Sequence, residues 1–313
     1  GHRMSDLDAI GSAEGVLRIC KICDVPAVIA VRRDATLAGS LINALIAAGQ
    51  EDDFIDPKGA LPIISQRTLC IVVDTYQLGL VESREILEKC GKVAVIDHHR
   101  KADNEIPAVI SWVDPNASSA SEMVTDLLQY FGDAGNLTPL EAEALLAGIT
   151  LDTKDFVMRT GEATFEAAAR LRKYGADTIL VKKLFATSMK SRMRRSKVVA
   201  SAEMYRGFAI SVVGESFEDI RVVCSQAADE MLNITGVDAS VTVYPIENGW
   251  SFSARSLGKV NVQVLMENIG NKKDDGGGHL TMAGAQLYNI DKEEAVQKLY
   301  DAIDKYYNKL PQD

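Results

Sequence analysis

Hydrophobic and polar positions between residues 9 and 185 alternate in a way that predicts short strands separated by amphipathic helices. We expect a strand over residues 27–31, a helix over residues 37–48 that Gly49 closes, and a helix near residues 81–89. Further strands should end at Asp74 and Asp97. After Ser111 the pattern predicts helices over residues 118–131, 139–149, 162–174 and 177–185. Strands that alternate with helices are typical of a parallel sheet.

Beyond residue 200 the pattern changes to shorter elements with more β structure. We expect a helix, a hairpin, a second helix, a loop through Gly278, a strand and a terminal helix to follow a first strand over residues 208–213. Residues 187–200 are polar, basic and free of strand signals, so we place a linker there. The sequence thus predicts an α/β protein with a larger domain over residues 1–186, whose mainly parallel sheet is flanked by helices, and a smaller mixed α/β domain over residues 201–313.

Composition narrows the function classes. The 313 residues are 47% hydrophobic and 25% charged, which is typical of a soluble globular protein. A formal net charge of −10 argues against binding to long nucleic acid, which requires basic surfaces. The basic run over residues 190–197 is consistent with the solvated face of a helix. The five cysteines, including Cys20 and Cys23, are interpreted as reduced structural thiols, because no second pair completes a zinc site.

Acidic and histidine residues gather in four short clusters of the larger domain. Asp74 and the Asp97-His98-His99 run each follow an apolar run, and the carboxyl ends of parallel strands converge on one crevice. The remaining clusters contain His2, Asp6 and Asp8, and Asp152. Carboxylates and imidazoles brought together there need a cation to offset their repulsion and desolvation. Their oxygen and nitrogen donors favour two Mn²⁺ ions, with Mg²⁺ or Co²⁺ as substitutes.

Each cluster also has a simpler interpretation. An Asp after a strand is commonly a helix cap or a turn residue. However, three of the four histidines of the chain lie in these clusters, and the fourth, His279, follows a glycine run. Without a metal site, four independent structural coincidences would be needed to explain this distribution. A single metal site explains all four clusters.

The constellation resembles the DHH phosphoesterase superfamily, which is named for the motif present here as Asp97-His98-His99. Residues 1–11, 137–142 and 152–156 are similar to GdpP-type (YybT-type) cyclic-di-AMP phosphodiesterases, and so is Arg159-Thr160-Gly161. Gly276-Gly277-Gly278-His279 resembles the signature of the accompanying DHHA1 domain. These motifs are spread over essentially the whole chain.

The resemblance implies a role for each cluster residue. His2 and Asp6 would bind one ion, and Asp74 would bridge it to a second ion. The ligands of that second ion would be Asp8, His98 and Asp152. As catalytic residues, Asp97 would orient an imidazole and His99 would contact the phosphate or protonate the departing oxygen, although a structural histidine at this position is the alternative.

The second domain is expected to bind the substrate. Gly276, Gly277 and Gly278 would let backbone N–H groups approach a phosphate or base, with His279 beside them, although glycine runs are commonly flexible loops. Arg255 would contact phosphate, and a salt bridge is the alternative.

The function implied is Mn²⁺-dependent hydrolysis of cyclic-di-AMP to 5′-pApA by a hydroxide that two metal ions activate. The alternatives are a nanoRNase or pAp phosphatase that acts on short linear nucleotides, and a nucleotide-sensing module that has lost catalysis. Pyrophosphatase or exopolyphosphatase activity fits the glycine-rich second domain less well.

Only Gly1 precedes His2, so we expect upstream residues to be missing from this chain, or Gly1-His2 to be a tag remnant. GdpP-type proteins carry transmembrane helices, a PAS domain and a degenerate GGDEF domain upstream. The resemblance therefore implies a cytoplasmic fragment of a membrane-anchored protein, without membrane contacts of its own and able to form a homodimer.

Overall fold

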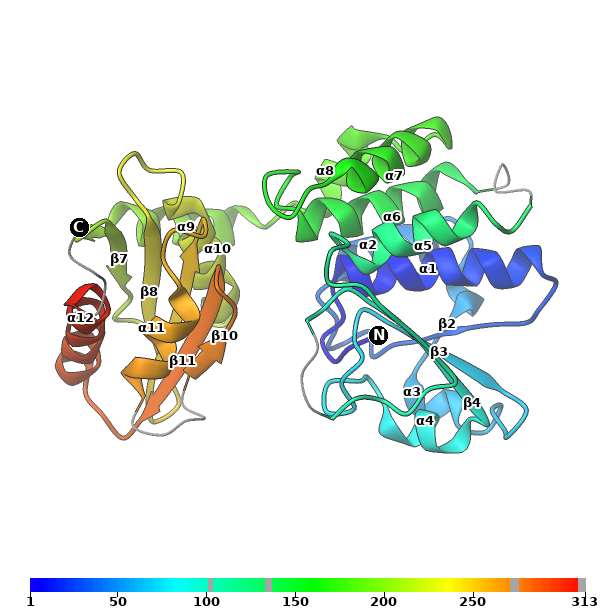
Figure 1. Cartoon of the computed structure of the whole chain (residues 1–313), viewed down its shortest axis with the longest axis horizontal. Helices are drawn as coiled ribbons and strands as arrows, with labels where there is room; N and C mark the ends of the chain where they lie inside the picture. Colours follow the sequence, from blue (N-terminus) through cyan, green and yellow to red (C-terminus); the bar gives the residue numbers. More distant parts are fainter. Residues whose placement is uncertain (101–103, 133–136, 271–275, 309–313) are drawn as a thin grey trace. The chain divides into compact units, whose positions relative to one another are not determined.

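The computed structural model describes residues 1–100, 104–132, 137–270 and 276–308, and it divides the chain into two compact units, Gly1–Ala186 and Thr187–Asp313 (Figure 1). No helix in these described ranges is long and apolar enough to cross a membrane. Both units combine helices with sheets, and the parallel sheets of the first confirm the predicted fold class.

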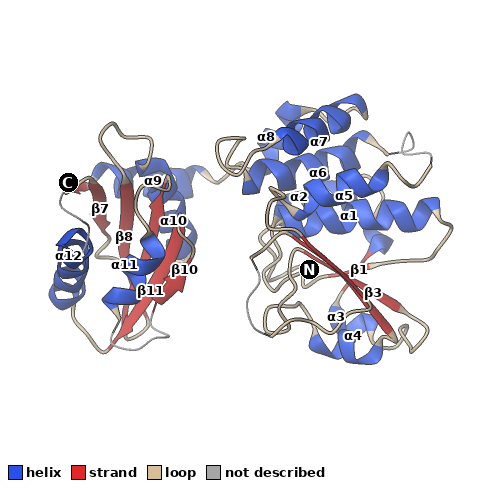
Figure 2. Cartoon of the chain, viewed as in Figure 1, coloured by secondary structure: helices blue, strands red, loops and turns tan. Residues whose placement is uncertain are grey.

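The N-terminal unit contains short parallel strands and a larger helical part (Figure 2). Its helices are α1 (Leu7–Ile22), α2 (Gly39–Ala47), η1 (Glu51–Asp53), α3 (Pro57–Ala60), α4 (Arg84–Lys89), α5 (Ala120–Leu128), α6 (Pro139–Asp152), α7 (Glu162–Lys173) and α8 (Thr178–Leu184). Its strands are β1 (Ile29–Ala30), β2 (Phe54–Ile55), β3 (Leu69–Val73), β4 (Lys92–Asp97) and β5 (Ile110–Val113).

Two parallel sheets form in this unit, and the larger one positions the candidate residues. Strands β3, β4 and β5 pair in that order, with Val73 opposite Ile96, so Asp74 and Asp97 emerge from neighbouring strand ends. Strands β1 and β2 form a separate pair. The predicted strand over residues 27–31 shortens to Ile29–Ala30, and neither α1 nor β5 was predicted.

Helices α1, α5 and α6 pack tightly around two glycines. A Cβ on Gly148 would lie 2.6 Å from Oδ1 of Asp8, and one on Gly11 would lie 2.3 Å from the carbonyl oxygen of Ala144. Both are therefore required for the close approach of α6 to α1. Helix α6 begins as predicted, because Thr138 and Glu141 form a capping box with Pro139 at the first helical position.

Among its described residues, the C-terminal unit has a six-stranded mixed sheet in the order β10-β11-β9-β8-β7-β6, in which the β7–β8 pair is parallel and the other pairs are antiparallel. Helices α11 and α12 cover one face, and α9 and α10 cover the other. Its strands are β6 (Glu203–Tyr205), β7 (Phe208–Val212), β8 (Ala239–Ile246), β9 (Gly249–Ser256), β10 (Gly276–Gly278) and β11 (Met282–Tyr288). Its helices are α9 (Met189–Ala200), α10 (Ile220–Met231), α11 (Val262–Ile269) and α12 (Lys292–Asn308).

The predicted hairpin, formed by β8 and β9, is confirmed, whereas one other segment differs from expectation. Residues 187–200, where we placed a linker, contain helix α9, which agrees with the interpretation of the basic run over residues 190–197 as a helix face; Val198 of this helix packs against Val223 and Ala227 of α10. Gly276–Gly278, predicted as a loop, is a strand paired with β11. The adjoining residues 271–275 of that expected loop lie outside the described residues.

Candidate metal centre

Asp8 is fully buried on the first turns of α1, where the start of α5 holds its carboxylate. The backbone N–H of Ala120 donates to Oδ2 at 2.7 Å, and that of Ser121 donates to Oδ1 at 2.8 Å. Helix α5 begins here because the Ser119 side chain caps it by accepting from the Glu122 N–H. The amides at a helix N-terminus favour an anion, so they fix the carboxylate and its orientation.

Asp74 follows β3 with a left-handed backbone, at φ 58°, which is uncommon for a residue other than glycine. Its two carboxylate oxygens point to different partners. Oδ2 lies 3.3 Å from Nε2 of His2, whereas Oδ1 lies 3.3 Å from Nε2 of His98 and 3.7 Å from Nδ1 of His99. One carboxylate therefore connects two groups of potential ligands.

Asp97 ends β4 and organises the turn that follows. Its Oδ1 accepts the backbone N–H of His98 at 2.8 Å and lies 2.7 Å from Nδ1 of His99. His98 is fully buried, with Nε2 3.1 Å from Oδ2 of Asp152, the last residue of α6. The side chain of His99 remains 42% exposed, although Asp97 engages its Nδ1.

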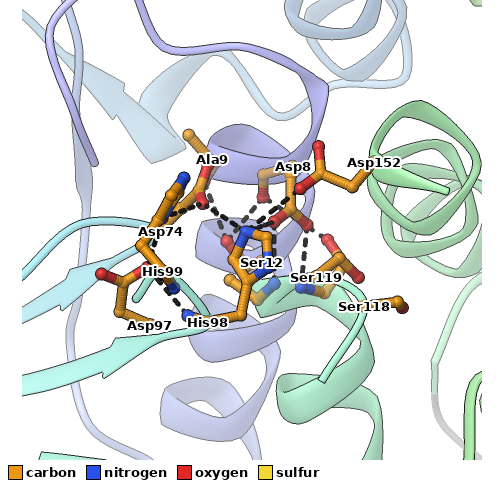
Figure 3. A network of polar contacts seen from close by, with 12 residues as sticks. Asp8, Ala9, Ser12, Asp74, Asp97, His98, His99, Ser118, Ser119 and Asp152 are labelled. Carbon is orange, nitrogen blue, oxygen red and sulfur yellow. Dashed lines mark hydrogen bonds and ion pairs between the residues drawn. The ribbon is translucent and has the colours of Figure 1, made fainter. Parts of the chain in front are cut away.

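The six predicted ligands come together in two groups from four segments of the unit. His2, Asp6 and Asp74 form one group, and Asp8, His98 and Asp152 form the other, with the ligand atoms of each group within 4.8 Å of one another. Figure 3 shows Asp8, Asp152 and His98 converging beside Asp74. His2 reaches its group through a bridge to Val81, and Asp6 caps α1 by accepting from the N–H of Asp8.

Burial and neighbouring charges shift the pKa values in this cluster. Burial raises the pKa of Asp8 well above its ordinary value, and the charges of Asp74 and Asp152 add to it. Burial opposes the charge on His2 and His98, but neighbouring carboxylates outweigh it and raise the pKa of each to about 11. The pKa of Asp74 falls, because the attraction of the nearby His2 and His98 side chains, each 3.3 Å away, outweighs the effect of its burial. Burial and mutual repulsion thus favour the protonated forms of several of these groups, and a bound cation would displace such protons.

Divalent metal ions fit these residues. Three buried atoms of the cluster, Oδ1 of Asp74, Oδ2 of Asp97 and Nε2 of His98, have no hydrogen-bond partner in the described part of the chain. Buried polar atoms are rarely left in this state without a ligand. The donor set contains oxygen and nitrogen and no thiolate, which favours Mn²⁺ or Mg²⁺ over softer ions.

The predicted substrate-binding residues of the C-terminal unit are placed differently. Arg255 is buried on β9, where its Nε donates to Asp229, Nη1 donates to the carbonyl of Ala254, and Nη2 donates to Ser225. His279 is exposed in a turn in which its N–H donates to the carbonyl of Met282.

Each glycine of β10 has its own surroundings. A Cβ on Gly276 would lie 2.3 Å from the carbonyl oxygen of Met266, and one on Gly278 would lie 2.5 Å from Cα of Ala283. A Cβ on Gly277 would meet none of the described residues within 4 Å. Packing explains two of the three glycines, whereas the described part of the chain leaves the space beside Gly277 open.

Sequence reasoning did not find the residues that hold Asp8. The amides of Ala120 and Ser121 bind it, and Gly148 makes room for it. Arg159, which was quoted only as part of the Arg159-Thr160-Gly161 motif and given no role, contacts His98. A local signal existed for the first of these, because Ser119 and Glu122 have the spacing of a helix start. Nothing local indicated that this helix start would meet Asp8.

Comparisons with known proteins agree with this architecture. Residues 1–149 match the DHH family, N-terminal domain, and residues 207–309 match the DHHA1 domain. Cyclic-di-AMP phosphodiesterase PdeA of Listeria monocytogenes is 40% identical over 98% of this chain and 47% of its own length. Cyclic-di-AMP phosphodiesterase GdpP of Geobacillus thermodenitrificans is 41% identical over the same shares. The chain thus spans about half the length of the curated relatives it matches.

A solved structure extends the agreement to the fold. An exopolyphosphatase-related protein from Bacteroides fragilis superposes with a TM-score of 0.81 at 23% identity, over 98% of this chain and 91% of that one. From the two matching domains and their order, the chain belongs to the DHH family and combines a DHH domain with a DHHA1 domain.

Proposed function

We propose that the DHH domain holds two divalent metal ions, with Mn²⁺ preferred. His2 and Asp6 bind one ion, Asp8, His98 and Asp152 bind the other, and Asp74 contributes one oxygen to each. The observation that carries this proposal is the division of the Asp74 carboxylate between the two ligand groups. When bound, such a pair of ions activates a water and offsets negative charge on a phosphate.

The proposed reaction is hydrolysis of cyclic-di-AMP to 5′-pApA. The substrate is supported by two relatives, named cyclic-di-AMP phosphodiesterases, that are 40% and 41% identical to this chain. Cleavage of one P–O3′ bond opens the ring, and the departing O3′ requires a proton. We assign this proton to the imidazolium form of His99: Asp97 accepts from Nδ1–H, the side chain is 42% exposed, and Nε2–H donates the proton to O3′.

The remaining residues keep the centre in place and bind the nucleotide. The N–H groups of Ala120 and Ser121 fix Asp8, so a ligand oxygen stays oriented when the site is empty of substrate. In the DHHA1 domain, Gly277 offers open space for a phosphate or base, with His279 two residues further on. A phosphate contact from Arg255 would require its guanidinium to separate from Asp229.

The same family resemblance leads us to propose that these two domains form the cytoplasmic catalytic part of a longer membrane-anchored protein. A homodimer is the assembly that we expect. Sedimentation of the purified chain would test the dimer directly.

Product analysis tests the proposed function. Metal-free protein is incubated with cyclic-di-AMP, with and without Mn²⁺, and the products are separated by chromatography. Mn²⁺-dependent pApA that is not converted further to AMP is the expected result. Release of AMP from pApA, with cyclic-di-AMP untouched, would select a linear-nucleotide hydrolase. Tight binding of cyclic-di-AMP without turnover in Mn²⁺ would select a sensing module.

A further inference from the structure

Arg159 is part of the Arg159-Thr160-Gly161 motif, and the roles assigned above leave it unexplained. Its Nη2 lies 3.2 Å from Nδ1 of His98 and donates, at 3.4 Å in each case, to the carbonyl oxygens of His98 and Ala117. The guanidinium therefore lies at the edge of the ligand group that contains His98.

A strained turn brings Arg159 back to this edge. Lys154, Asp155, Phe156 and Arg159 all have left-handed backbones, with φ between 51° and 64°. Thr153 holds the turn together, because its side chain accepts the N–H of Phe156 and its carbonyl accepts two further N–H groups. Strain of this kind persists where the surroundings enforce it, and it concentrates at functional sites. Here it joins the end of α6, with Asp152, to Arg159.

Among the residues that the structure describes, no carboxylate pairs with the charge of Arg159. Three other arginines show the usual arrangement: Arg18 pairs with Glu141, Arg170 with Asp126, and Arg255 with Asp229. In the described ranges Arg159 forms no ion pair, and only Nη2 has a hydrogen-bond partner. The residue is exposed, so its Nη1 and Nε remain available to an anion.

A phosphodiester is the anion that this arrangement suits. The centre is rich in carboxylates, which repel a negatively charged substrate, and a fixed guanidinium offsets that repulsion. Its planar donors match two oxygens of one phosphate group. We propose that Arg159 binds a non-bridging oxygen of the scissile phosphate and orients it at the metal centre. This inference rests on the proposed phosphodiesterase function.

The test compares Arg159→Gln and Arg159→Lys with a matched control, Arg67→Gln, which removes an exposed arginine of the same domain. Turnover is measured with cyclic-di-AMP and with bis(p-nitrophenyl) phosphate, an activated diester. Calorimetry measures binding of Mn²⁺, and binding of inorganic phosphate to the Mn²⁺-loaded protein. We expect Arg159→Gln to reduce kcat/KM on both substrates by about 10- to 100-fold, the effect of one charged hydrogen bond.

Further expected results distinguish substrate binding from a structural role. Arg159→Gln should weaken phosphate binding and leave Mn²⁺ affinity unchanged, and Arg159→Lys should recover part of both losses. Unchanged kcat/KM and phosphate binding would overturn the inference, and so would a parallel loss of Mn²⁺ affinity, which indicates a support for His98. If the wild type cleaves only the activated diester, the cyclic-di-AMP proposal fails and Arg159 is still tested. If the wild type cleaves neither substrate, the Arg159 proposal is decided by whether Arg159→Gln weakens the binding of inorganic phosphate. A wild type that binds no Mn²⁺ overturns both proposals.

Discussion

The candidate residues of the two domains differ in whether their buried polar atoms find hydrogen-bond partners within the chain. In the DHH domain, Asp74, Asp97 and His98 each keep a buried polar atom without a hydrogen-bond partner in the described ranges. In the DHHA1 domain, Arg255 is engaged by Asp229, Ala254 and Ser225. Buried polar atoms without a partner are rare in folded proteins, and several of them together indicate a ligand, whereas satisfied ones are explained by the fold. Geometry therefore supports a metal centre in the first domain more strongly than a substrate clamp in the second.

We expect the largest effect when Asp74, whose carboxylate both ligand groups share, is removed. Asp74→Ala should reduce turnover by at least about 10³-fold, because both ligand groups lose an oxygen. Its Mn²⁺ content, measured by mass spectrometry after gel filtration, should also fall. Asp34→Ala, which removes an exposed aspartate of the same domain, is the control. Near-normal activity with two ions bound would show that the cluster is held together without Asp74.

Substitution of His99 tests whether proton transfer and metal binding depend on different residues of the cluster. His99→Ala should lower kcat on cyclic-di-AMP by about 10²- to 10⁴-fold, the usual contribution of a general acid, and retain its Mn²⁺. On bis(p-nitrophenyl) phosphate the loss should be much smaller, because p-nitrophenolate departs without a proton. Equal losses on the two substrates would contradict a proton-donor role, and a loss of Mn²⁺ would make His99 a ligand.

The sequence predicted the cluster residues better than their supports. Asp74 and Asp97 could be placed because each follows an apolar run, and parallel strands bring such ends together. The contact between Asp8 and the start of α5 joins residues 112 positions apart, and no local pattern encodes it. Strand β5 was missed because its four residues are mostly exposed and carry no clear alternation.

Tertiary context also overrode local preference in the second domain. Glycine disfavours strands, so Gly276–Gly278 was expected to be a loop, yet pairing with β11 makes it a strand. The bounds of helix α9 could not be predicted, although the basic run over residues 190–197 was interpreted as a helix face, because only Val198 among its twelve residues is buried and little amphipathic pattern remains. In both cases the deciding contact lies with a partner distant in sequence.

Substitutions in the glycine run of β10 test which of its glycines serve packing and which leave room for a ligand. Gly276→Ala should destabilise the protein by about 1–3 kcal/mol, because its Cβ meets the backbone of Met266. Gly277→Ala should leave the unfolding temperature nearly unchanged and raise KM for cyclic-di-AMP, because the space beside it is open. Thermal unfolding and steady-state kinetics measure the two effects. An unchanged KM would leave the glycine run with a structural role alone.

We expect the smallest effect at Glu14. This residue also has a buried oxygen without a hydrogen-bond partner in the described part of the chain, but a proton explains it better than a metal ion. Oε2 of this buried side chain on α1 lacks a partner in the described ranges, while Oε1 accepts from Gln50. Burial raises the pKa of Glu14 from 4.5 to about 7, with Glu141 adding to the shift and Lys21 opposing it. We infer that this carboxyl holds a proton rather than a metal.

The sign of the expected pH dependence follows from that shift. The folded state binds the Glu14 proton more tightly than the unfolded state, so stability should fall as pH rises from about 4.5 to 7 and change little above that range. The loss should be at most about 3 kcal/mol. Glu14→Gln should remove this part of the pH dependence, as measured by urea unfolding at pH 5, 6, 7 and 8. A parallel pH profile in the variant would show that the Glu14 proton makes no difference to folding, and the unpartnered Oε2 would then itself require a ligand.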